Sequence, residues 1–137
     1  MTVQSRLFPV LRYRDPKAAI NFLVEAFGFS THAVHADQEG AIVHAELKLG
    51  ESMVMLGPVD AEIGATGRTV SGGLSSIYAS VPFVDGHHDR AVAAGAVVTR
   101  PLADTAYGSR EYGCRDIEGY EWHFGTYDPF LAGTENS

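Results

Sequence analysis

The stretch FPVLRYRDPKAAINFLVEAFGF, residues 8–29, decides the fold. Alternating side chains from Leu7 to Tyr13 predict a β-strand, and Pro9, which has no N–H to donate, predicts that this strand lies at a sheet edge. Asp15-Pro16 predicts a helix start, because Asp accepts free amide hydrogens and Pro already has a helical φ. Apolar residues follow at helical spacing, and Gly28 predicts a left-handed helix end. The stretch therefore encodes a strand followed directly by a helix.

The rest of the chain repeats this order of elements. Further strands are expected at residues 29–36, 41–49 and 52–56, and then a second unit with a strand at 74–81, a helix that Asp85 caps and Gly95 ends, and strands at 97–102, 109–115 and 120–127. We expect one domain, residues 1–137, built of modules 6–57 and 73–127, a linker 58–72 that could act as a lid, and a loose tail 128–137. Two such units must pair, within one chain or between chains, to bury their sheet faces.

Composition narrows the class of protein. The 137 residues carry a formal net charge of −7, which disfavours nucleic acid as a partner. No apolar run approaches the length of a membrane span, and no secretory signal is evident. The single cysteine, Cys114, excludes an internal disulfide. These features predict a cytoplasmic protein that acts on a small molecule.

The layout resembles the vicinal oxygen chelate superfamily, which includes glyoxalase I, extradiol dioxygenases and bleomycin-resistance proteins. The resemblance rests on residues 8–29 and on YGSREYGCRDIEGYEWHFGTY, residues 107–127, with its R-E pair, R-D-x-x-G turn and aromatic last strand. It implies an α+β fold in which two βαβββ modules form a curved eight-stranded mixed sheet with helices on the outer face. The concave face would be the binding cleft. It also implies a homodimer, often formed by exchange of an element, in which both chains line each cleft.

The resemblance further implies four metal-ligand positions. They fall here at Phe8, Met55, Ser76 (or Tyr78, if the register slips) and His123. Phe8 offers no donor, Met55 offers a thioether that suits Cu(I), and Ser76 is a weak neutral ligand, so only His123 is competent. We therefore predict no metal and no cofactor. Recruitment of His44 or Glu46 as substitute ligands stays open.

Alternation along the strands assigns the remaining cleft residues. The predicted ligand-binding set is Phe8, Arg12, His44, Met53, Met55, Ser76, Tyr78, Glu121 and His123. The residues expected on the opposite, helix-covered faces are Leu7, Leu11, Val54, Leu56, Ile77, Val81, Trp122 and Phe124. Aromatic and thioether side chains with a few polar groups are typical of a binding pocket. The alternative is that Phe8, Met53 and Met55 simply fill the core.

Other clusters have ordinary explanations. A Cys114–His123 dyad and a Ser76–His123–Glu121 triad are possible nucleophilic sites, but a lone strand Cys is usually buried packing, and residues two apart on a strand stand side by side. The run from His87 to Asp89 is expected to be a solvated helix face. Arg110 and Glu111 are expected to brace the sheet or a dimer.

Three functions remain. The first is metal-independent binding or sequestration of a small aromatic or cationic, antibiotic-like molecule in the cleft. The second is a metal-dependent lyase or isomerase that resembles glyoxalase I. The third is a metal-free enzyme in which His123 is the general acid or base. Whether the protein is an enzyme is left open by the sequence.

Overall fold

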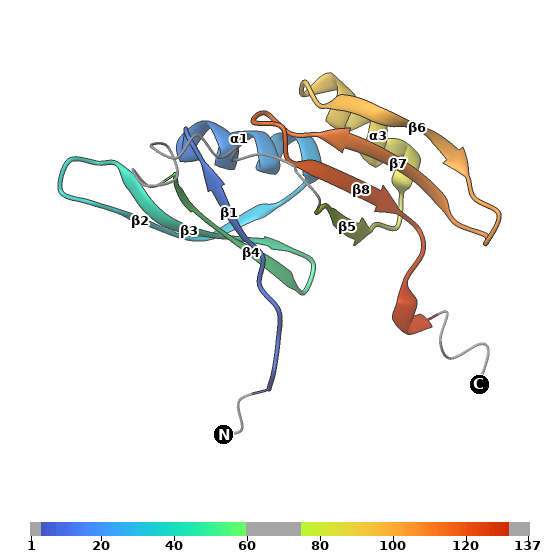
Figure 1. Cartoon of the computed structure of the whole chain (residues 1–137), viewed down its shortest axis with the longest axis horizontal. Helices are drawn as coiled ribbons and strands as arrows, with labels where there is room; N and C mark the ends of the chain where they lie inside the picture. The colour runs from blue at the N-terminus through green and yellow to red at the C-terminus, as the bar shows by residue number, and fades with distance from the viewer. Residues whose placement is uncertain (1–3, 60–74, 132–137) are drawn as a thin grey trace.

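The computed structural model describes residues 4–59 and 75–131, and it contains two modules with the same order of elements (Figure 1). The first module consists of β1 (Val10–Tyr13), α1 (Pro16–Phe27), β2 (Ser30–Ala36), β3 (Ile42–Leu49) and β4 (Ser52–Pro58). The second consists of β5 (Ile77–Ser80), α3 (Val84–Ala93), β6 (Val97–Asp104), β7 (Arg110–Arg115) and β8 (Glu121–Gly125). The predicted duplication is therefore present in the structure.

Helix α1 forms for the reasons that its sequence suggests. The Asp15 carboxylate accepts a hydrogen bond from the backbone N–H of Ala18 at 3.1 Å, and Pro16 is the first helical residue. Gly28 has a φ of 84°, which places it in the left-handed region where glycine is favoured. Both predicted ends of this helix are confirmed.

Helix α3 begins differently from the prediction. Phe83 holds the N-cap position and makes no side-chain cap, whereas Asp85 lies inside the first turn. The Asp85 carboxylate instead pairs with Arg110 of β7, 2.7 Å from the guanidinium Nε. The predicted cap was wrong because this carboxylate has a charged partner on the neighbouring sheet.

The two sheets share one strand order, β1-β4-β3-β2 and β5-β8-β7-β6. The β1–β4 and β5–β8 pairs are parallel, and the other neighbours are antiparallel. β1 lies at an edge, as Pro9 predicted. The expected α+β class with two βαβββ modules and mixed sheets is confirmed. Within the described residues the sheets remain two four-stranded units, and no strand pairing joins β1 to β5.

The core lies on the helix-covered side of each sheet. The predicted helix-facing residues that are buried are Leu11, Val54, Leu56, Val81, Trp122 and Phe124. Ile77 is half-buried, but Leu7 is 96% exposed, so its assignment to the helix side was wrong. The reason is that β1 begins at Val10, three residues later than expected, and Leu7 precedes the sheet.

The second module holds both ends of α1. The Glu118 carboxylate in the β7–β8 turn accepts hydrogen bonds from the backbone N–H groups of Arg14 and Asp15, at 2.7 and 2.8 Å. At the other end, the Arg90 guanidinium of α3 donates to the carbonyls of Glu25 and Val24, at 2.7 and 3.0 Å. A cation at a helix C-terminus is favourable because the last carbonyls have no helical partners. These contacts fix the position of one module against the other.

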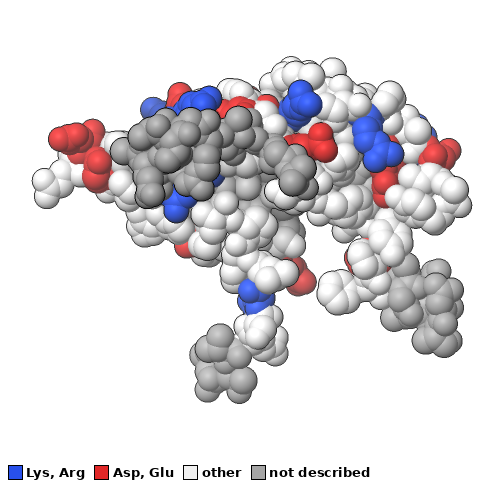
Figure 2. Space-filling view, in the orientation of Figure 1, with Lys and Arg blue, Asp and Glu red and all other residues white. Residues whose placement is uncertain are grey.

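Several expectations fall on residues that are not described. The predicted linker 58–72 and its role as a lid lie largely outside the described residues, as does most of the tail 128–137. Among the residues that are described, no helix is long and apolar enough to cross a membrane. Figure 2 shows acidic side chains at the tip of the β2–β3 hairpin and no continuous basic patch on the face drawn, in keeping with the net charge of −7.

Candidate functional site

Each sheet has one face turned away from its helix, which we call its inner face. The burial alternation along the strands separates this face from the core, since Ala45 and Leu47 of β3 are buried between exposed or half-buried neighbours. The first inner face carries Val10, Arg12, His44, Glu46, Met53 and Met55. The second carries Tyr78, Arg100, Glu111, Glu121 and His123. The predicted cleft residues therefore divide between two surfaces.

The first inner face combines thioethers with imidazoles around one carboxylate. Glu46 lies opposite Met55 in the β3–β4 register, and its Oε2 is 2.9 Å from His44 Nε2. His35 stacks on His44 with ring centroids 5.8 Å apart, and His32 Nε2 is 4.0 Å from Glu46 Oε1. The hydrogen bond from His44 is the main cause that lowers the pKa of Glu46, so this carboxyl group is anionic at neutral pH.

The aromatic and thioether residues of the first module are not core. Phe8 lies before β1 and is 43% exposed, while Met53 and Met55 are half-buried. The core-filling alternative for these three residues is therefore wrong. Arg12 is exposed, and its guanidinium donates to the carbonyl of Pro58 at 3.3 Å.

His123 is the centre of the second inner face. It lies between Tyr78 of β5 and Gly113 of β7 in the sheet register. A Cβ at Gly113 would come within 2.8 Å of the His123 ring, so glycine at this position lets the imidazole lie over the neighbouring strand. The Glu121 carboxylate, two residues earlier on β8, is 3.1 Å from His123 Nε2. The two residues, which alternation predicts on one face of the strand, are therefore in direct contact.

A pocket of about 340 Å³ opens beside His123. Its lining includes Tyr78, Arg100, Tyr107, Glu111, His123 and Tyr127. A Cβ at Gly125 would collide with Glu111 Cγ and come within 2.8 Å of Tyr78 Oη, so this glycine lets β5 and β7 side chains approach each other across β8. The pocket therefore depends on two glycines of the inner face.

Tyrosine hydroxyls fix the walls of this pocket. Tyr107 Oη donates to Glu111 Oε1 at 2.7 Å, and Tyr78 Oη donates to the carbonyl of Tyr127 at 2.7 Å. The hydrogen bond to the Glu111 carboxylate raises the pKa of Tyr107, and burial raises the pKa of Tyr78. Both phenols consequently stay protonated at neutral pH and act as hydrogen-bond donors.

The structure unites only part of the predicted set. A groove of about 700 Å³ between the modules is lined by both Met53 and Tyr78, which come from different sheets. Phe8, Arg12, His44 and Met55 do not line this groove or the pocket beside His123. Ser76 is exposed ahead of β5, and no hydrogen bond among the described residues joins it to His123 or Glu121, so a Ser76 triad is not formed.

Five pocket residues were not predicted from the sequence: Arg100, Tyr107, Glu111, Tyr127 and Pro129. Tyr107 lies in the β6–β7 loop, and Arg100 lies next to irregularities in the β6–β7 register, where simple alternation fails. Glu111 was detectable, because it alternates on β7 with the buried residues Tyr112 and Cys114.

The positions of Cys114 and His87 decide two other predictions. Cys114 is fully buried opposite Trp122, on the side of β7 away from His123, and burial raises the pKa of its thiol to about 12. A Cys114–His123 dyad is therefore excluded. His87 was expected on a solvated surface, but its ring is half-buried and hydrogen-bonds to the Phe27 carbonyl and the Tyr112 hydroxyl. That expectation was wrong for His87 because α3 turns this residue toward α1 and β7.

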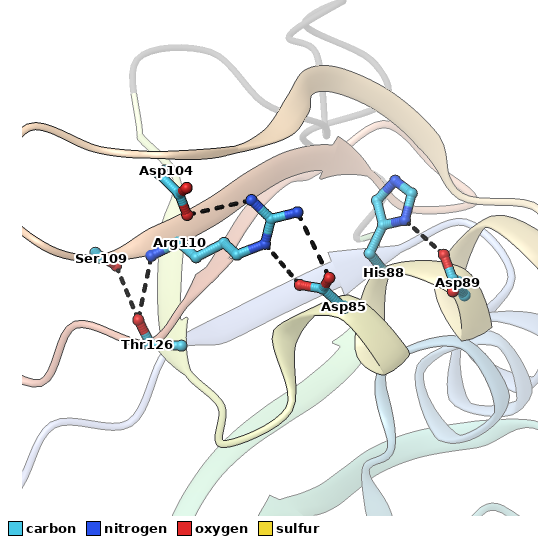
Figure 3. A network of polar contacts seen from close by, with 7 residues as sticks. All are labelled: Asp85, His88, Asp89, Asp104, Ser109, Arg110 and Thr126. Carbon is cyan, nitrogen blue, oxygen red and sulfur yellow. Dashed lines mark hydrogen bonds and ion pairs between the residues drawn. The ribbon is translucent and has the colours of Figure 1, made fainter.

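Arg110 serves as a brace, as predicted. Its guanidinium reaches Asp85 of α3 and Asp104 of β6, at 2.7 and 3.2 Å (Figure 3). In the same view His88 pairs with Asp89 on the α3 surface, away from Arg110. Arg110 thus ties the start of α3 to the β6–β7 hairpin that carries the pocket.

Comparisons with known proteins agree with this architecture. A family model described as the Glyoxalase/Bleomycin resistance protein/Dioxygenase superfamily matches residues 6–124. An uncharacterized protein of Mycobacterium bovis is 30% identical over 129 residues, which cover 91% of this chain and 85% of that protein. The crystal structure of TioX from Micromonospora sp. ML1 has a TM-score of 0.72 at 33% identity, covering 88% of this chain and 94% of TioX. The fosfomycin resistance protein FosX from Listeria monocytogenes has a TM-score of 0.71 at 12% identity, covering 94% of this chain and 98% of FosX, which shows a shared fold.

The donor set does not fit the divalent metal that the resemblance implies. Of the four positions, Phe8, Met55 and Ser76 supply no imidazole or carboxylate, and only His123 is a good ligand. Within residues 4–59 and 75–131, no group of three or more His, Cys, Asp or Glu side chains is placed to hold a metal ion. The open alternative of His44 and Glu46 provides a hydrogen-bonded pair, and among the described residues no third side chain completes a metal-binding group with them.

Proposed function

Because this chain belongs to the glyoxalase/bleomycin resistance protein/dioxygenase superfamily, we propose that it binds and sequesters a small aromatic or cationic, antibiotic-like molecule without a metal. One observation carries the proposal: apart from His123, the family's metal positions here have no imidazole or carboxylate donor, while His123 borders a tyrosine-lined pocket. Tyrosine faces and the Glu111 carboxylate attract aromatic and cationic groups.

The first inner face adds a second apolar surface to the proposal. Met53 and Met55 provide flexible, polarisable contacts, and Met53 shares the intermodule groove with Tyr78. A ligand larger than the tyrosine pocket would extend along this groove.

A thermal-shift screen with aromatic and cationic antibiotics tests this function directly. A ligand present at 100 times its Kd stabilises the fold by about 2.7 kcal/mol, which raises the melting temperature by several degrees. The shift should be equal in the presence and absence of EDTA. A shift that EDTA abolishes, or a screen in which no aromatic or cationic compound stabilises the protein, would contradict the proposal.

We further propose that the functional unit is a homodimer with shared clefts. Two observations support it: the edge strands β1 and β5 each have a single neighbour within the described chain, and Val10 of β1 is 53% exposed. A second copy of the chain would cover these edge strands. It would also bring the first inner face of one chain next to the second inner face of the other. Sedimentation equilibrium should give twice the chain mass, and a monomer at micromolar concentration would contradict this arrangement.

A metal-free enzyme is the second candidate, and the Glu121–His123 contact favours it. A carboxylate that hydrogen-bonds one imidazole nitrogen orients the ring, as general bases require. The test is to incubate each ligand from the screen with the wild type and with His123→Gln and to analyse the compound afterwards. Conversion by the wild type alone would support catalysis, whereas recovery of unchanged ligand from both would contradict it.

A further inference from the structure

The pocket beside His123 contains one charge of each sign. Arg100 and Glu111 both line it, and both also line an adjoining pocket of about 310 Å³. They do not form an ion pair with each other, and no described residue binds the Arg100 guanidinium. Among the residues that the structure describes, Glu111 accepts a hydrogen bond only from the neutral Tyr107 hydroxyl. Each charge is therefore available to a ligand.

The other charges near the pocket are paired or lie outside its lining. Arg110 is held by Asp85 and Asp104, and Glu121, which is hydrogen-bonded to His123, does not line the pocket. Arg100 and Glu111 thus remain as the two charged groups of the pocket lining that have no charged partner among the described residues.

The sheet register sets these two charges apart on one face. Arg100 of β6 lies opposite Gly113 of β7, and Glu111 lies two residues before Gly113 on the same strand. Tyr107 donates to Glu111 Oε1 at 2.7 Å, and it lines both pockets together with Arg100. Its ring meets that of Tyr127 edge to face, with centroids 5.6 Å apart. An apolar wall of tyrosine rings therefore adjoins the two opposite charges.

We propose that this pocket takes a zwitterionic ligand, with its ammonium group at Glu111, its carboxylate at Arg100 and an apolar or aromatic body against the tyrosine rings. A guanidinium binds a carboxylate with two parallel hydrogen bonds, and an ammonium gains from both a carboxylate and aromatic faces. This assignment rests on the proposed binding function, and it specifies the class of ligand that the second inner face would bind.

Three indole compounds that differ only in charge test the assignment. They are L-tryptophan, which carries both groups, tryptamine, which carries only the ammonium, and 3-indolepropionate, which carries only the carboxylate. Isothermal titration at fixed ionic strength should give L-tryptophan an affinity about tenfold or more above either singly charged compound, since a charged hydrogen bond typically contributes at least that factor. This comparison uses the wild-type protein alone and so does not depend on any variant folding.

Two variants then assign each charge to its residue. Glu111→Gln should weaken L-tryptophan and tryptamine about tenfold and leave 3-indolepropionate unchanged, and Arg100→Gln should weaken L-tryptophan and 3-indolepropionate and leave tryptamine unchanged. Glu39→Gln and Arg6→Gln are the matched controls, because each removes one negative or one positive charge from an exposed position outside the pocket. Neither should change the affinity for any of the three indoles.

Several outcomes would overturn the assignment. Equal affinity for L-tryptophan and either singly charged compound would do so, as would an unchanged L-tryptophan affinity in either pocket variant, or absence of binding by all three compounds. If the three indoles fail while the antibiotic screen yields a metal-independent ligand, the zwitterion assignment is wrong and the binding function stands. If the screen also fails, both are wrong.

Discussion

At the scale of single residues, the shape of the site depends on two glycines, which have no side chain. Gly113 leaves room for the His123 ring, and Gly125 leaves room for Tyr78 and Glu111. Neither glycine has a positive φ, so backbone conformation does not require glycine at these positions. Space for neighbouring functional side chains is the physical reason for both.

Gly125→Ala should therefore damage binding more than folding. The new methyl group would push Glu111 and Tyr78 apart, and we expect ligand affinity to fall at least tenfold, measured by titration with whichever ligand the screen provides. Gly86→Ala is the matched control: it lies in α3 with nothing within 4 Å of the added Cβ, and it should keep full affinity. Wild-type affinity in Gly125→Ala would show that these side chains do not form the site.

At the scale of elements, local signals predicted what lies within one segment. Asp15-Pro16 and Gly28 fixed α1, and strand alternation identified the buried sides of β4 and β8. Contacts between distant segments could not be predicted in this way. Asp85 was assigned as a helix cap because its ion-pair partner, Arg110, lies 25 residues away in the sequence. His87 was assigned to the solvated surface because no nearby residue indicates its hydrogen bond to the Phe27 carbonyl.

The pocket shows the same division. Tyr78 and His123 were found because alternation on β5 and β8 is regular. Arg100 and Tyr107 were missed because register shifts in β6 and the loop after it break the alternation. Irregular segments carry part of the site, and a period of two cannot describe them.

His87 joins three elements through a neutral ring. The Phe27 carbonyl of α1 can only accept, so Nε2 carries the hydrogen and donates at 3.0 Å, and Nδ1 accepts from the Tyr112 hydroxyl of β7 at 2.6 Å. A second proton on Nδ1 would deprive Tyr112 of its acceptor. Burial is the main cause that lowers the pKa of His87 below its ordinary value of 6.5, and the nearby Arg90 charge acts in the same direction.

Acid should therefore weaken the fold through His87. Because its pKa is lower in the folded state, the unfolded chain binds more protons below about pH 6.5, so the contribution of His87 is complete above that pH and is lost as pH falls. Urea unfolding from pH 8 to pH 5 should show a smaller loss of stability for His87→Gln than for wild type. Identical pH profiles for wild type and His87→Gln would refute this role.

At the scale of the whole molecule, one buried carboxylate links the modules. Asp116 accepts the Tyr13 hydroxyl from the first module at 2.5 Å, and from its own module it accepts the Trp122 indole N–H at 3.0 Å and the backbone N–H groups of Glu118 and Tyr120. Four donors therefore converge on two oxygens in the core. The junction that positions the two inner faces depends on this arrangement.

Asp116→Asn should loosen that junction. The amide group would point a donor at groups that are themselves donors, and we expect a loss of roughly 2–4 kcal/mol in the free energy of unfolding, measured with urea. Asp89→Asn, at a carboxylate that is 81% exposed, should cost less than about 0.5 kcal/mol. An Asp116→Asn protein as stable as wild type would mean that this carboxylate does not hold the modules together.

The central claim is that this family fold binds its ligand without a metal, and metal content tests it most directly. The protein should be purified without an affinity tag, nickel resin or chelator, and analysed by inductively coupled plasma mass spectrometry. We predict far less than one equivalent each of zinc, nickel, manganese and iron per chain. One equivalent of any of these metals in the wild type, and its absence from His123→Ala purified in the same way, would contradict the account.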